Sequence, residues 1–285
     1  MKNYLNKRNL LFIILNLITL AMAYPPLNNL LSSAARREYY SHIPLIPIIS
    51  IFFLYQQRQG IVLSQEYDWR PGVFLLALSS VLYLLGMSRE KILSLNDFSA
   101  ILTIASLIFW VGAFLFCYGR RAFRRALFPI LFLLFVVPIP EKLMDGIIYY
   151  LQVGSTEFTH LLFLLTGIPF IREEFVFQLP GMSIEVAKQC SGIRSTLALV
   201  ITSLIAGELF LKTGWKKLIL VLSVFPITVF KNGLRIAVLS LLGVYVDPRI
   251  LGSELHRSGG IPFFGLALLF MAPILFYLMK TEKKK

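Results

Sequence analysis

The chain has 285 residues, of which 57% are apolar and 15% are charged, and its formal net charge is +13. A soluble domain of this length cannot bury so much apolar surface, so the composition indicates an integral membrane protein. Two cysteines are too few for a disulfide framework, and membrane topology explains the basic charge without a nucleic-acid partner.

The N-terminal part of the sequence, residues 1–122, predicts a transmembrane scaffold of about four helices. Apolar runs long enough to cross a bilayer fall near 10–30, 39–56, 72–88 and 97–118. The first run is also compatible with a signal peptide, because the tripeptide Ala-Met-Ala within it resembles a cleavage site. Either interpretation leaves the residue that follows on the outer side.

Basic residues mark the predicted cytoplasmic side. The stretch "GRRAFRRALF" after the fourth span places four arginines in one short loop: Arg120, Arg121, Arg124 and Arg125. The loops assigned to this side hold 16 basic and three acidic residues, so they carry the whole net charge. The positive-inside rule therefore predicts that both ends of the chain are inside.

The remaining residues, 123–285, predict a catalytic transmembrane core. It starts with a span near 123–139, which Pro138 and Pro140 end. The next stretch, 141–167, is apolar in patches but carries several titratable side chains, which favours an amphipathic or re-entrant helix on the outer side. The alternative is a further span, which would invert every later segment.

A β-hairpin and three spans complete the predicted chain. Residues 171–187 alternate polar and apolar side chains around Pro180-Gly181, which is typical of two short strands joined by a type II turn. Spans follow near 191–211, 217–246 and 260–280. We therefore expect an all-α polytopic membrane protein of about eight transmembrane helices, with an outer amphipathic helix and a short β-hairpin, forming a single integral membrane unit.

Cys190 is the first candidate for chemistry, in the stretch "VAKQCSGIRSTLAL" where the hairpin meets the sixth span. A helix N-terminus and the nearby Arg194 both lower the pKa of a thiol towards a reactive thiolate. Ser191 and Gly192 are auxiliary candidates, since a glycine permits a sharp turn or a close backbone approach. The alternative is a small buried cysteine in a helix cap. Cys117, among apolar neighbours, is predicted to be structural.

Arg235 is the second candidate, in "FKNGLRIAVLSLLG" within the seventh span. A guanidinium inside a membrane segment usually faces a bundle interior or a wet cavity, although a structural or snorkelling cation is the alternative. Asn232 and Gly233 are expected to break the helix and to bring Arg235 near its outer end. We interpret Lys231 as a cation that reaches for lipid headgroups.

His256 is the third candidate, in "ELHRSGGIPFF" just before the last span. His160, on the helix predicted over 141–167, is its main rival as a base. A thiol, a base and an anion-stabilising group suffice for acyl transfer through a thioester. No pattern predicts metal ligands, a cofactor or a phosphate loop.

At these residues the sequence resembles the exosortase/archaeosortase family of membrane cysteine transpeptidases. The matching stretches cover roughly 127–265 and include "GIPFIREEFVFQLPGMSIEVAKQCSGIRSTLAL", "KNGLRIAVLSLLG" and "LHRSGGIPFF". The resemblance implies catalytic roles for Cys190, Arg235 and His256. It implies secreted protein substrates with a C-terminal sorting signal, namely a short motif such as Pro-Glu-Pro, a transmembrane helix and a basic tail. It further implies an envelope acceptor, polysaccharide or lipid, and an active site on the outer side of the inner membrane.

Two alternatives stay open at this point. One is an archaeosortase-like enzyme with a lipid acceptor, although a histidine at position 256 is more similar to the bacterial exosortases. The other is a non-enzymatic membrane protein for export or assembly of envelope polysaccharide, because broken helices and intramembrane cations also mark transport paths. That second alternative predicts that a Cys190→Ser variant keeps its activity.

Overall fold

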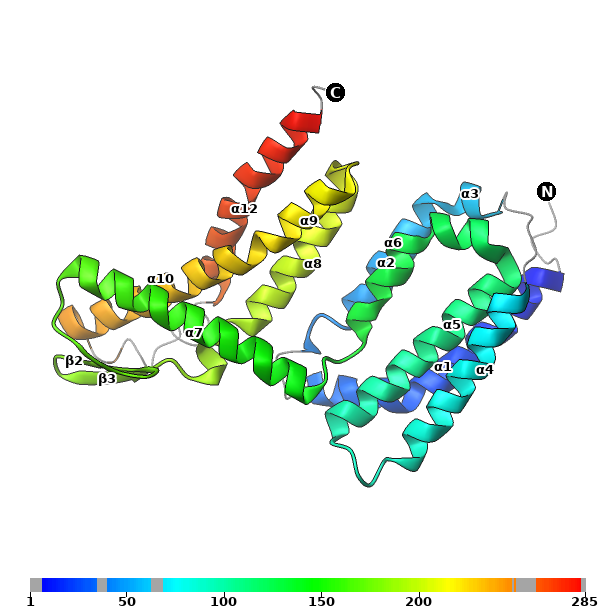
Figure 1. The fold of residues 1–285 in the computed structure, drawn as a ribbon, viewed down its shortest axis with the longest axis horizontal. Coiled ribbons are helices and arrows are strands. Elements are labelled where there is room, and N and C mark those ends of the chain that lie inside the picture. Colours follow the sequence, from blue (N-terminus) through cyan, green and yellow to red (C-terminus); the bar gives the residue numbers. More distant parts are fainter. Residues whose placement is uncertain (1–6, 35–39, 63–68, 248, 250–259, 283–285) are drawn as a thin grey trace. The chain divides into compact units, whose positions relative to one another are not determined.

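The computed structural model describes residues 7–34, 40–62, 69–247, 249 and 260–282. These residues are mostly helical, with one small antiparallel sheet (Figure 1). The chain divides into two compact units, Met1–Leu143 and Met144–Lys285. The predicted fold class, an all-α polytopic protein with a short β-hairpin, is confirmed.

Among the described residues of the first unit, the elements named below are helices and one 3₁₀ turn. They are α1 (Lys7–Ala34), α2 (Leu45–Gln56), α3 (Arg58–Val62), α4 (Trp69–Ser88), α5 (Leu95–Arg125), α6 (Leu127–Phe132) and η2 (Leu133–Val136). The helix α5 is central, because both α1 and α4 pack along it (Figure 1). Small residues permit the close approach of α4, since a Cβ on Gly72 would lie only 2.6 Å from the backbone of Phe116.

The C-terminal end of α5 is where the predicted cytoplasmic arginines lie. The backbone at Gly119 has φ 78°, which interrupts the regular helix before Arg120. From the last turn, Arg125 donates a hydrogen bond of 2.9 Å to the carbonyl of Gly60. The basic stretch therefore follows a bend at the end of the longest apolar helix, as expected of a segment that leaves the bilayer.

The second unit begins within the first turn of α7 and contains the remaining elements. They are α7 (Glu141–Thr166), β1 (Ile171–Glu173), β2 (Val176–Leu179), β3 (Met182–Glu185), η3 (Lys188–Ser191), α8 (Ile193–Phe210), α9 (Gly214–Leu222), α10 (Val224–Tyr245) and α12 (Gly260–Glu282).

The sheet has the order β1-β2-β3 with both pairs antiparallel. Gly181, with φ 79°, makes the turn between β2 and β3 after Pro180, as the sequence predicted. The structure adds the strand β1, which a tight turn at Glu174 joins to β2. The inner face of the sheet packs on α7 and α10 through an apolar cluster that includes Phe163, Phe177 and Ile236.

A second apolar cluster joins α8, α9, α10 and α12, and includes Leu199, Leu220 and Met271. At one end of this bundle the carboxylate of Glu282, the last residue of α12, accepts hydrogen bonds of 3.0 and 2.8 Å from the backbone amides of Lys212 and Thr213. The C-terminal ends of α8 and α12 therefore lie together, because one carboxylate contacts the connection that follows α8.

The predicted count of eight spans is not confirmed. By length and composition, the described residues contain six spans that can cross a membrane, with α9 and α10 counted together, or up to seven if α6, η2 and α7 form one broken span. The segment predicted over 39–56 contains only the 12 residues of α2, which extend about 18 Å and fall short of the hydrocarbon core. Pro138 and Pro140 keep the α6–η2 segment equally short.

The predicted break at Asn232 and Gly233 is wrong, because α10 runs through both residues without interruption. The helix is interrupted earlier, at Ser223, because Pro226 lacks the N–H that would continue the hydrogen-bond ladder out of α9. Gly233 has a different role, since a Cβ there would lie 2.8 Å from the ring of Phe158 in α7. It permits α7 and α10 to cross closely.

Candidate active site

Two hydrogen bonds of the Val186 backbone hold the segment that leads to Cys190. Val186, which is fully buried after β3, donates its N–H to the carbonyl of Phe175 at 2.9 Å and accepts a hydrogen bond of 2.5 Å from Gln152 Nε2. The 3₁₀ turn η3 then carries Cys190 to the start of α8. The side chain of Cys190 and the whole of His256 lie outside the part of the chain that the structure describes, so the predicted cluster with Arg235 stays a prediction.

Gly192 forms the sharp turn between η3 and α8. Its backbone has φ 77° and ψ 14°, in the left-handed region that disfavours residues with a Cβ. The turn also packs tightly, because a Cβ on Gly192 would lie 3.3 Å from Cγ and Oδ1 of Asn232. Gly192, two residues after Cys190, therefore both forms a left-handed turn and lets Asn232 approach the backbone closely.

The carbonyl of Gly192 is held by the first turn of α8. It accepts hydrogen bonds of 2.8 Å from Ser195 Oγ and 2.9 Å from both Thr196 Oγ1 and the Thr196 backbone amide. These bonds fix the position at which the helix begins. The positive end of the α8 dipole consequently lies beside the segment that contains Cys190.

Three polar residues of α10 line up next to this turn. Lys231 is 2% exposed and donates a hydrogen bond of 2.5 Å to Ser195 Oγ, so the interpretation that it reaches for headgroups is wrong. Asn232 is fully buried and donates to Ser155 Oγ of α7 at 3.0 Å. Arg235, which is half-buried, follows Lys231 by one helical turn and lies on the same side of α10.

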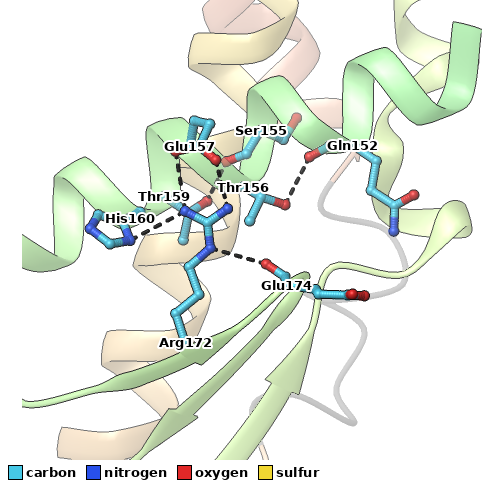
Figure 2. Close-up of polar contacts among 8 residues, drawn as sticks. All are labelled: Gln152, Ser155, Thr156, Glu157, Thr159, His160, Arg172 and Glu174. Carbon is cyan, nitrogen blue, oxygen red and sulfur yellow. Dashed lines mark hydrogen bonds and ion pairs between the residues drawn. The ribbon is translucent and has the colours of Figure 1, made fainter.

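A polar stripe on α7 supports the site, and the sequence analysis did not find it. Figure 2 shows Gln152, Ser155, Thr156 and Thr159, which are all buried and fall at positions i, i+3, i+4 and i+7 of one helix face. Besides the bonds of Gln152 and Ser155, Thr159 Oγ1 donates to the carbonyl of Ser155 at 2.7 Å and lies 3.3 Å from the carbonyl of Gly233. The signal in the sequence was the helical spacing of uncharged polar residues in "LQVGSTEFTH".

His160, the rival base, belongs to a clasp between α7 and β1 (Figure 2). Arg172 contacts both carboxylate oxygens of Glu157, at 2.6 and 3.1 Å, and its Nε donates to the carbonyl of Glu174. The Glu157 carboxylate raises the pKa of Arg172. Arg172 Nη1 lies 3.3 Å from His160 Nδ1, and since a guanidinium can only donate, Nδ1 is the acceptor. The clasp therefore occupies one nitrogen of this imidazole.

Two further features of the site are the Ser191 hydroxyl and the kinds of polar group present. Ser191, next to Cys190, is fully buried, and its hydroxyl has no hydrogen-bond partner within the described ranges. The described residues contain no group of three or more His, Cys, Asp or Glu side chains that could hold a metal ion. The polar groups gathered here are hydroxyls, amides and cations, which suit the binding of an anion or an acyl group.

Comparison with known proteins gives one match. The family model described as transmembrane exosortase matches residues 33–273, which include both Cys190 and Arg235 and extend into the two compact units. No curated protein matches the chain, and no solved structure matches it either. A match over more than half of the sequence shows the family: this integral membrane protein belongs to the transmembrane exosortases, whose general role is protein sorting by membrane peptidase or transpeptidase chemistry.

Proposed function

We propose that the protein is a membrane-embedded cysteine transpeptidase that cleaves C-terminal sorting signals of secreted proteins and transfers the cleaved proteins to an envelope acceptor. The substrates carry a short motif of the Pro-Glu-Pro type, a transmembrane helix and a basic tail, as the family resemblance implies. The acceptor is a polysaccharide or a lipid of the cell envelope. Family membership supports the class of reaction.

The observation that carries this proposal is the position of Cys190 in the chain. It lies in η3, immediately before the left-handed Gly192 turn and the N-terminus of α8. Lys231 and Asn232 of α10 pack against that turn, and Arg235 follows them by one turn of helix. A thiol close to a helix N-terminus and to cations is stabilised as a thiolate, which is the nucleophilic form.

The proposed reaction has two steps. The Cys190 thiolate attacks the scissile carbonyl carbon, Arg235 stabilises the oxyanion, and the C–N bond breaks as His256 gives a proton to the leaving amine. A nucleophile of the acceptor then loses its proton to His256 and attacks the thioester carbon. The C–S bond breaks, and the thiolate of Cys190 is regenerated.

The ends of α8 support an outer location for the site. The helix has 18 residues and is therefore about 27 Å long, close to the thickness of the hydrocarbon core. Its far end lies beside the C-terminal end of α12, where basic residues gather: Lys212, Lys216, Lys217 and Lys280. The positive-inside rule assigns that end to the cytoplasm and the Cys190 end to the face where secreted proteins emerge.

Three residues have auxiliary roles in this proposal. Arg194 is exposed in the first turn of α8, where it can tune the thiol or bind the substrate. The buried hydroxyl of Ser191 is a hydrogen-bond donor for the substrate next to the nucleophile. Asn232 keeps the Gly192 turn in place, because it contacts that turn and donates to Ser155.

The experiment that tests the proposal compares the two cysteines. A Cys190→Ala variant should abolish processing of a co-expressed secreted protein that bears the tripartite signal, while the variant accumulates in membranes at the wild-type level. Cys117→Ala is the matched control, since Cys117 is buried in α5 and its removal should leave processing intact. Wild-type processing by the Cys190→Ala variant would refute the proposal.

A further inference from the structure

Lys231 is a buried cation to which the two proposed reaction steps assign no role of its own. Its side chain is 2% exposed, and it forms no salt bridge with any carboxylate in the described part of the chain. Its ammonium donates to a neutral hydroxyl, Ser195 Oγ. Burying an ammonium away from water is costly unless an anion or several hydrogen bonds compensate it. An anion that develops next to this ammonium would compensate that cost and would itself be stabilised.

The position of the ammonium shows where that charge would be. A Cβ on Gly192 would lie 3.6 Å from Lys231 Nζ, so the ammonium lies directly against the turn that follows Cys190. The bond to Ser195 Oγ, which itself donates to the Gly192 carbonyl, holds Nζ at this turn. The ionisable group nearest to Gly192 along the chain that can become an anion is the thiol of Cys190.

We propose that Lys231 is a positioning residue of the nucleophile: its buried ammonium stabilises the thiolate of Cys190 through the Gly192 turn. This inference rests on the proposed function, because it assigns Cys190 as the nucleophile. Lys231 acts together with Arg235, which lies one turn further along α10. Lys231 keeps a positive charge at the Gly192 turn, whereas Arg235 stabilises the oxyanion of the substrate.

Several other charged groups flank this segment from the elements packed around it. They are Lys188 in η3 and Asp145 in α7, whose Nζ and Oδ1 are 3.2 Å apart, Glu185 in β3, Arg194 in α8 and Arg235 in α10. Lys188 provides the matched control for Lys231, because it lies two residues before Cys190, as Gly192 lies two residues after it. Its side chain is 67% exposed and it has a carboxylate partner, so solvent screens its charge.

The test measures the reactivity of the Cys190 thiol directly. The full-length protein, with Cys117→Ala to leave one thiol, is reconstituted in phospholipid nanodiscs and alkylated with iodoacetamide over a range of pH. Lys231→Met keeps the length of the side chain but removes its charge. We expect this variant to shift the midpoint of the alkylation profile upwards by about one pH unit or more, because a cation held at the turn after Cys190 favours the thiolate. Lys231→Arg should restore most of the wild-type midpoint.

Two controls separate a charge effect from a structural one. Lys188→Met removes an exposed charge and should leave the midpoint nearly unchanged. Ser195→Ala keeps the ammonium but removes the bond that holds it at the turn, so it should shift the midpoint by clearly less than Lys231→Met. An unchanged profile in Lys231→Met, or an equal shift in either control, would overturn the inference. Alkylation does not depend on substrate, so a Lys231 effect in a protein that fails to process any sorting signal would refute the proposed function alone.

Discussion

At the scale of single residues, His160 and His256 are the two candidates for the general acid–base that transfers protons. His160 is partly buried on α7, and its Nδ1 accepts from the guanidinium of Arg172. The contact suits a residue that fastens β1 to α7 and does not suit a residue that exchanges protons with substrate. His256 is the base of our proposal.

Substitution of each histidine by glutamine distinguishes these roles. His256→Gln should lower the rate of signal processing about 100-fold or more, which is the usual contribution of a general acid–base. His160→Gln should keep the rate within a few-fold of wild type, since a glutamine carbonyl can also accept from Arg172. Processing rates measured in membranes that contain equal amounts of each variant decide between them. A large loss in His160→Gln with an unaffected His256→Gln would reverse the assignment.

The proposed catalytic residues were easier to find in the sequence than the buried residues around them. Cys190, Arg235 and His256 stand out in the sequence because charged or nucleophilic side chains are rare beside apolar spans. Lys231 also stood out, but its burial could not be predicted, since a lysine near a helix end reaches the headgroups in most membrane proteins. Its burial depends on contacts with Ser195 and Gly192, which are almost 40 positions away in the sequence.

At the scale of the secondary-structure elements, the Gly192 turn joins η3 to α8. Hydropathy places the start of this helix near the correct residue, because the apolar run begins there. The left-handed conformation and the contact with Asn232 come from the packing of α8 against α10. The polar stripe of α7 likewise has a pattern in the sequence, but its partners, among them Gly233 and Val186, are visible only in the folded chain.

The Gly192→Ala variant tests whether this turn is specific to the active site. Gly181→Ala is its matched control, because Gly181 has nearly the same φ, 79°, but no atom within 4 Å of its added Cβ. Each substitution should cost about 1–2 kcal/mol for the left-handed backbone. Only Gly192→Ala should also displace Asn232 and abolish signal processing.

Thermal unfolding in detergent and processing in membranes are the two measurements for this pair. Equal losses of stability, together with a selective loss of processing in Gly192→Ala, are the expected result. If Gly181→Ala abolished processing to the same extent, processing would depend on the sheet or on stability in general. That result would contradict a special role of the Gly192 turn.

At the scale of the whole molecule, apolar runs predicted the membrane class and most of the spans. The errors fall where length or continuity depends on local chemistry: α2 is too short to span, and α10 continues through Asn232 and Gly233. A polar or small residue does not break a helix when a neighbouring helix offers it a partner. Here Asn232 donates a hydrogen bond to Ser155, and the ring of Phe158 packs against Gly233. The boundary between scaffold and catalytic core, predicted at residue 122, stays a prediction.

The central claim is that Cys190 forms a covalent acyl intermediate with its substrate. The most direct measurement is mass spectrometry of the full-length protein after acid quenching of its reaction with a sorting-signal substrate in membranes. Trypsin should release the peptide Gln189–Arg194, because Lys188 and Arg194 are cleavage sites. The account predicts that this peptide carries the substrate fragment as a thioester that hydroxylamine removes. Processing of the substrate with an unmodified Cys190 at every time point, or with the adduct on another residue, would contradict it.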